Sequence, residues 1–141
     1  MTSIIDFTQY NEDEIQDPIA VESGEYKIRL IDMGDGVREN SAGNPYILPR
    51  FEVCDEPIAK DFSNYMALPV DGMDAKALQR NLASLKNFCK AFGITFEQLY
   101  AHIQANDFND MLGLEAWAIL GQKDDPEYGP QNYIKKWVVG A

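Results

Sequence analysis

One short stretch decides how this chain folds: residues 24–30, which read GEYKIRL. Its apolar residues Tyr26, Ile28 and Leu30 alternate with charged ones. Because successive side chains of a β-strand point to opposite faces, this period of two predicts a strand that is buried on one side. The charged side carries two cations, Lys27 and Arg29, so the predicted strand has a partly basic outer face.

The same period of two recurs further along the chain and predicts four more strands. They are expected at residues 46–53, 61–68, 112–121 and 131–139. Pro49 falls inside the first of these segments. Because proline has no N–H to donate to a neighbouring strand, we expect an edge strand or a bulge there. A loop at residues 122–130 separates the last two predicted strands.

Between the third and fourth predicted strands, the period becomes that of a helix. Apolar residues recur every three or four positions over residues 75–92, which predicts an amphipathic helix. Asp71 or Asp74 can cap its first turn, and Gly93 suits the left-handed position that ends a helix. Residues 95–98, TFEQ, match a capping box and predict a second, shorter helix.

The order of these elements indicates the fold class. Three strands, a helix with a short second helix, and two more strands follow one another in a mainly β chain. This is the order of a five-stranded OB-like Greek-key barrel with its helix between strands 3 and 4. In that fold the helix plugs one end of the barrel. The alternative is an α+β sandwich with the helix on one face of a sheet.

Charge divides the chain into two parts. The 141 residues contain 12 Lys and Arg against 23 Asp and Glu, a net charge of −11, which by itself argues against a nucleic-acid-binding surface. Residues 1–25, however, hold seven acids and no base. The other 116 residues hold 16 acids and all 12 bases, so their net charge is only −4. We therefore divide the chain into an acidic N-terminal arm, residues 1–23, and one domain, residues 24–141.

Several classes of protein are excluded by what the sequence lacks. No apolar run reaches the ~18–20 residues that a membrane helix needs, and the N-terminus does not read as a signal peptide. Cys54 and Cys89 lack metal-binding spacing and are expected to be reduced in a cytoplasmic protein. With His102 as the single histidine and no phosphate-binding or nucleophile motif, we expect no enzyme, no cofactor and no metal site.

A mixture of cations and aromatic residues is expected on the outer face of the barrel. If the apolar side of each strand points inward, these residues point outward, together with one arginine in the first long loop. The set is Lys27, Arg29, Arg38, Tyr46, Arg50, Tyr133, Lys135 and Trp137. Proteins that bind single-stranded nucleic acid stack bases on aromatic rings, at ~1–3 kcal/mol per base, and hold the phosphates with cations. Alternatively, Tyr133 and Trp137 pack beneath the acidic arm or against a partner subunit.

Several short motifs, in their order, resemble a known family. They are GEYKIRL at residues 24–30, SAGNP at 41–45, FEV at 51–53, the Leu-rich helix and NYIKKW at 132–137. Over roughly residues 22–139, the chain resembles phage-encoded single-stranded-DNA-binding proteins of the OB-fold type, including phage proteins of unknown function. Many such proteins end in an acidic tail, whereas this chain ends in KKWVVGA and has its acidic segment at the other end.

The resemblance implies an accessory of phage DNA replication or recombination. Such a protein coats single-stranded DNA in the host cytoplasm, without sequence preference and without a cofactor. Replication or recombination proteins and further copies of the chain are its expected partners, and no membrane is. The alternative is a protein–protein interaction module or adaptor on the same barrel, because exposed Tyr, Trp and Arg also suit a protein interface.

Overall fold

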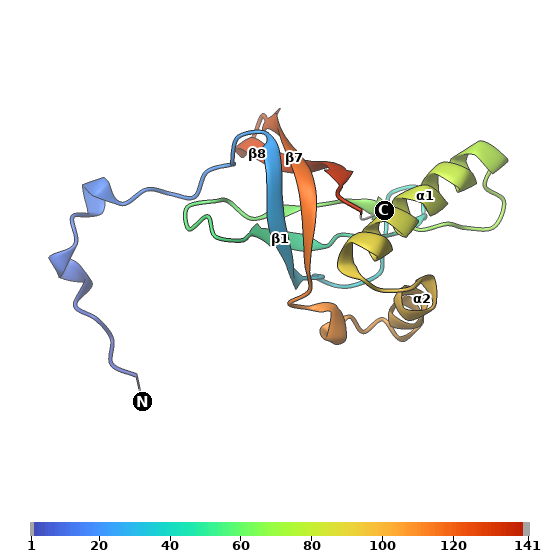
Figure 1. The fold of residues 1–141 in the computed structure, drawn as a ribbon, viewed down its shortest axis with the longest axis horizontal. Coiled ribbons are helices and arrows are strands. Elements are labelled where there is room, and N and C mark those ends of the chain that lie inside the picture. Colours follow the sequence, from blue (N-terminus) through green and yellow to red (C-terminus); the bar gives the residue numbers. More distant parts are fainter. Residues whose placement is uncertain (1, 140–141) are drawn as a thin grey trace.

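The protein is described by a computed structural model that covers residues 2–139. The chain is mainly β, with two α-helices (Figure 1). A five-stranded antiparallel sheet has the order β5 (Phe62–Ser63), β4 (Arg50–Val53), β1 (Gly24–Asp32), β7 (Glu115–Asp125) and β8 (Gly129–Trp137). A three-stranded sheet has the order β2 (Arg38–Glu39), β3 (Pro45–Ile47) and β6 (Met66–Ala67). The helices are α1 (Ala75–Phe92) and α2 (Phe96–Ala105), and short 3₁₀ turns lie at Phe7–Gln9, Glu12–Glu14 and Asn109–Met111.

The five-stranded sheet is curled until its two edges meet. Its edge strands, β5 and β8, contact each other, so the sheet forms a nearly closed barrel. The predicted mainly β class is thereby confirmed, and the barrel is consistent with an OB-like architecture. Closing a sheet in this way removes exposed strand edges, which would otherwise be open to pairing with another chain.

Two predicted strands are each divided into two short ones. The segment expected at residues 46–53 breaks after Ile47 and resumes at Arg50, so its halves, β3 and β4, belong to different sheets. Pro49 lies in the break and is fully buried, and its carbonyl accepts a hydrogen bond from the backbone N–H of Asn64 at 2.9 Å. The segment at residues 61–68 divides in the same way into β5 and β6. The prediction of two continuous strands is therefore wrong, because proline ends the first ladder and the chain changes sheets.

A β-bulge in β8 overturns the predicted position of Trp137. Ile119 of β7 pairs with Lys136 and the next residue pairs with Ile134, so Lys135 is left without a partner in the ladder. One extra residue reverses which side chains face inward from that point on. As a result Lys135 and Lys136 are both exposed, while Trp137 turns into the barrel and is only 9% exposed. The prediction that Trp137 faces outward is wrong.

Trp137 lies in an aromatic cluster at the centre of the hydrophobic core. Its ring meets those of Phe51, Phe88 and Phe92 edge-to-face, at centroid distances of 5.8, 5.6 and 5.3 Å. Phe51 belongs to β4, while Phe88 and Phe92 belong to the buried side of α1. Edge-to-face pairs of this kind add stabilisation beyond the burial of their area. The cluster therefore joins α1 to the barrel.

Helix α1 begins and ends where the sequence predicts, and α2 begins where its capping box predicts. The carboxylate of Asp74 accepts hydrogen bonds from the backbone N–H groups of Lys76 and Ala77, and so caps α1. Gly93 follows the helix with φ of +73°, a conformation that an L side chain rarely adopts. At α2, Thr95 and Gln98 form the complete capping box. These predictions are confirmed because caps depend on residues only a few positions apart.

The β7–β8 hairpin is longer than the sequence predicts. The loop expected at residues 122–130 shrinks to a turn between Asp125 and Gly129, with both strands extended on either side. The Asp125 carboxylate accepts hydrogen bonds from the backbone N–H groups of Glu127 and Tyr128, which lowers its pKa. A local side-chain turn therefore closes the hairpin.

The N-terminal arm is attached to the barrel only near its C-terminal end. Residues 2–19 are exposed throughout, and Figure 1 shows the arm leading away from the sheet. Attachment begins at Ile19, which forms a parallel bridge with Ala59. Buried Asn132 of β8 then exchanges two hydrogen bonds of 2.9 Å with the backbone of Val21. Residues 19–21 thus lie against the barrel, ahead of β1.

Candidate nucleic-acid interface

An exposed tryptophan lies beside a lysine on the outer face of the barrel. Lys27 of β1 and Trp117 of β7 are direct cross-strand partners, so their side chains are neighbours on one face. Trp117 is 50% exposed, which leaves much of its indole open to solvent. The Lys27 Nζ lies 3.8 Å from Glu115 Oε1, a partly exposed contact of little strength.

The same face continues across β7 onto β8. The Lys123 Nζ lies over the ring of Tyr133, 5.9 Å from its centroid. That ring covers Gly121, where an added Cβ would come within 2.7 Å of its atoms. Lys136 lies opposite Ile119, which in turn pairs with the acidic Glu25. We call this face the Trp117 surface; it comprises Lys27, Trp117, Ile119, Lys123, Tyr133, Lys135 and Lys136.

Arg29 points to the same side of β1 but is held by two carboxylates. Its Nη1 lies 2.5 Å from Glu52 Oε1 and its Nη2 lies 2.7 Å from Glu115 Oε2. These charge-assisted hydrogen bonds raise the pKa of Arg29, and the bond from Arg29 lowers the pKa of Glu115. The guanidinium of Arg29 in β1 thus forms ion pairs with both neighbouring strands, β4 and β7. Its charge is matched within the protein, which leaves it a weaker phosphate ligand than the lysines nearby.

Three other predicted site residues lie away from the Trp117 surface. Arg50 begins β4, and its Nη2 lies 3.8 Å from Asp61 Oδ2. Arg38 and Tyr46 are partners in the small sheet, where Tyr46 stacks on half-exposed Tyr65 with ring centroids 4.5 Å apart. The break at Pro49 separates them from Arg50, so the single face expected for residues 46–53 does not form.

The eight predicted residues therefore divide into distinct groups. Lys27, Tyr133 and Lys135 belong to the Trp117 surface, while Arg29 shares that side but is paired with acids. Trp137 belongs to the core.

Four residues of the Trp117 surface were missed by the sequence prediction: Trp117, Ile119, Lys123 and Lys136. Trp117 alternates with the buried Ala116 and Ala118, so the period of two already pointed it outward. Lys123 fell in the segment expected to be a loop, and only the extended hairpin sets it above Tyr133.

The two cysteines and the histidine belong to different elements: Cys54 follows β4, Cys89 lies in α1 and His102 lies in α2. Burial raises the pKa of the Cys89 thiol to about 11, and it also raises the pKa of Cys54. His102 Nδ1 lies 2.9 Å from the carbonyl oxygen of Asp107, at the end of α2. Among residues 2–139, no three His, Cys, Asp or Glu side chains are grouped to hold a metal ion. Within the same range, no helix is both long enough and apolar enough to span a membrane.

Comparisons with known proteins assign no family: no protein-family model and no curated protein matches this chain.

Proposed function

We propose that the protein binds single-stranded DNA on the Trp117 surface, without sequence preference. One observation carries this proposal: a half-exposed tryptophan lies beside Lys27 on an antiparallel sheet whose strands β7 and β8 also expose Lys123, Lys135 and Lys136. Every base has a π-face, so stacking on an indole does not depend on sequence. The net charge of −11 is no obstacle, since the exposed arm carries a large share of it.

Each part of the surface has a separate role in this proposal. Trp117 stacks one base, and Tyr133, backed by Lys123, offers a second and less exposed ring. Lys27, Lys123, Lys135 and Lys136 neutralise nearby phosphates. With about four lysines engaged, the logarithm of the association constant should fall with the logarithm of salt concentration with a slope of about −3.

The strand order supports the finer assignment of an OB-type Greek-key barrel. Counting β1, β4, β5, β7 and β8 as strands one to five, the order across the sheet is 3-2-1-4-5, with the outer two in contact. Both helices lie between strands three and four in sequence, and α1 sends Phe88 and Phe92 into the core. OB folds bind oligonucleotides on such barrels.

The biological role follows from the family resemblance together with the proposed binding. Coating of single strands during phage DNA replication or recombination, in the host cytoplasm, needs neither catalysis nor a cofactor. It does need affinity for any sequence, which stacking and phosphate contacts supply. Replication or recombination proteins are the protein partners proposed for this role.

A salt-dependent titration tests the proposal. Fluorescence anisotropy of labelled oligo-dT, oligo-rU and duplex DNA of equal length should show tightest binding to oligo-dT, with a slope near −3. Lys136→Ala should reduce the magnitude of that slope by ~0.7. The matched control, Lys90→Ala on the exposed side of α1, should leave it unchanged. Absence of binding at micromolar protein and low salt would refute the proposal.

A protein–protein interaction module is the second candidate function. The observation that favours it is the arm, which exposes acidic and apolar side chains together. If the Trp117 surface served a protein instead, the protein would bind none of the three oligonucleotides, and Trp117 would still be required for capture of that partner.

A further inference from the structure

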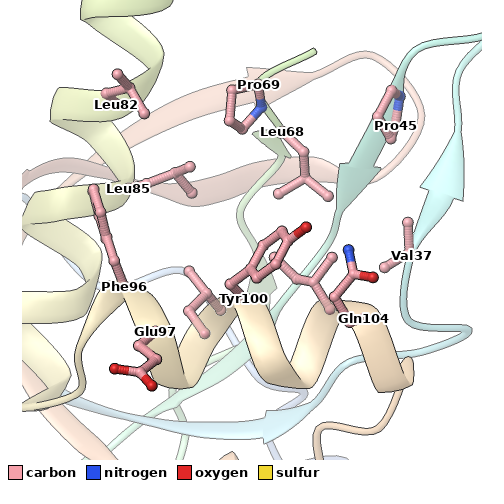
Figure 2. Close-up of a pocket in the computed structure, with 12 residues that line it drawn as sticks. Val37, Pro45, Leu68, Pro69, Leu82, Leu85, Phe96, Glu97, Tyr100 and Gln104 are labelled. Carbon is pink, nitrogen blue, oxygen red and sulfur yellow. The ribbon is translucent and has the colours of Figure 1, made fainter. Parts of the chain in front are cut away.

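An apolar groove lies between the two helices and the small sheet, away from the Trp117 surface. Its volume is about 620 Å³, within the range of well-formed ligand sites. Figure 2 shows Leu82 and Leu85 of α1 together with Phe96 and Tyr100 of α2 along its walls. Tyr100 is 63% exposed, and Phe96 is nearly half exposed. The groove thus leaves apolar side chains in contact with solvent.

The N-terminal arm also exposes apolar side chains to solvent. Ile4, Ile5 and Phe7 are 88%, 65% and 71% exposed, so the most apolar part of the arm has no cover. The arm nonetheless contains a short 3₁₀ turn that begins at Phe7 and is capped by the Asp6 side chain. Among the described residues, the hydrogen bonds of residues 2–18 join near neighbours in the sequence.

Charge complementarity links the arm to the exposed side of α1, next to the groove. Residues 2–18 contain five acids and no base. Helix α1, which supplies one wall of the groove, contains Lys76, Arg80, Lys86 and Lys90 and no acid. These four bases are exposed beside the groove rather than lining it, and the one charged residue of the lining is Glu97 of α2. Opposite charges attract over roughly 8–10 Å at physiological salt, so a segment seated against α1 is favoured when it is acidic. The arm therefore supplies apolar side chains that suit the groove, and acids that suit the exposed basic side of α1 next to it.

We propose that residues 4–7 of one copy of this chain occupy the groove of a second copy. The arm is pinned to the barrel at residues 19–21, and Figure 1 shows it leaving on the side opposite α1 and α2. Its apolar end is therefore presented to a neighbouring molecule rather than to its own groove. Reciprocal exchange closes a two-fold dimer, and one-way exchange builds a chain of copies. The assembly requires no nucleic acid and is independent of the function proposed above.

Cysteine cross-linking between two variants tests this occupancy. One full-length variant carries Phe7→Cys and the other Tyr100→Cys, both with Cys54→Ser, so that buried Cys89 is the remaining native thiol. Mixed and oxidised without DNA, they should form a disulfide-linked dimer containing one of each. Replacing Tyr100→Cys with Tyr128→Cys, at the exposed hairpin turn, should abolish the product. Equal cross-linking to position 128 would overturn the proposal.

Sedimentation velocity provides the second readout. The unmodified protein should sediment as dimers or larger species at tens of micromolar. Phe7→Asp and Tyr100→Glu should each shift it at least tenfold in concentration towards monomer, while Tyr128→Glu should not. Because residue 7 is exposed, Phe7→Asp leaves the barrel intact, as an unchanged melting temperature will show. A monomer at every concentration overturns the proposal, as does a cross-link within one chain carrying both Phe7→Cys and Tyr100→Cys.

Discussion

Replacing Trp137 by alanine should cost the protein much of its stability rather than its affinity for DNA. The side chain is 9% exposed and meets three phenylalanine rings at 5.3 to 5.8 Å. Truncation of a buried aromatic residue to alanine costs about 3–5 kcal/mol, through lost transfer energy and the cavity left behind. Domains of this kind have a total stability of about 5–15 kcal/mol, so Trp137→Ala should remove a large fraction of it.

Urea unfolding followed by far-ultraviolet circular dichroism measures this loss without relying on tryptophan fluorescence. The urea concentration at the unfolding midpoint should fall sharply, while the dependence of the unfolding free energy on urea concentration should not change. The melting temperature should drop by roughly 10–15 °C. Trp117→Ala is the matched control, since that indole is half exposed and should cost at most about 1 kcal/mol. The milder Trp137→Phe keeps the fold and should bind oligo-dT as tightly as the unmodified protein.

The opposite pattern would refute this reasoning. If Trp137→Ala lost under 1 kcal/mol of stability and Trp137→Phe weakened DNA binding, Trp137 would be a surface residue. The bulge at Lys135 would then not reverse the faces of β8.

Four further predictions concern the Trp117 surface and its surroundings. Trp117→Ala should weaken oligo-dT binding by about 5- to 150-fold, the equivalent of ~1–3 kcal/mol. Trp117→Phe should retain the affinity but lose the fluorescence quenching that DNA induces. If the quenching persists in Trp117→Phe, it arises from another residue. Gly121→Ala should displace the ring of Tyr133, which leaves no room for a Cβ, and cost about 1–3 kcal/mol in urea unfolding. Because the pKa of Glu115 is lowered in the folded protein, its ion pair stabilises the fold at pH values above the usual pKa of 4.5. This stabilisation is lost as the pH falls through the lower pKa of the folded state. Glu115→Gln should therefore make the free energy of unfolding less dependent on pH in that range. Deleting residues 2–18 should tighten oligo-dT binding if their acids compete with DNA, and unchanged or weaker affinity counts against that competition.

Part of the candidate site could be predicted from the sequence because alternation fixes the face of a regular strand. Lys27 and Arg29 share one side of β1, as their spacing indicates. The sequence could not reveal that Arg29 is clamped, because Glu52 and Glu115 reach it from strands distant in the chain. Nor could it separate Tyr46 from Arg50, since the change of sheet at Pro49 depends on where each half finds a partner.

The sequence by itself determined the two helices with their caps, the mainly β class and the concentration of acids at the N-terminus. These features depend on composition or on residues within one or two turns of each other. Only the tertiary structure decided that Trp137 is buried. Ladder pairing with β7 places a bulge at Lys135, and this single unpaired residue turns Trp137 into the core. Trp117, on an unbulged part of β7, keeps its outward position beside Lys27.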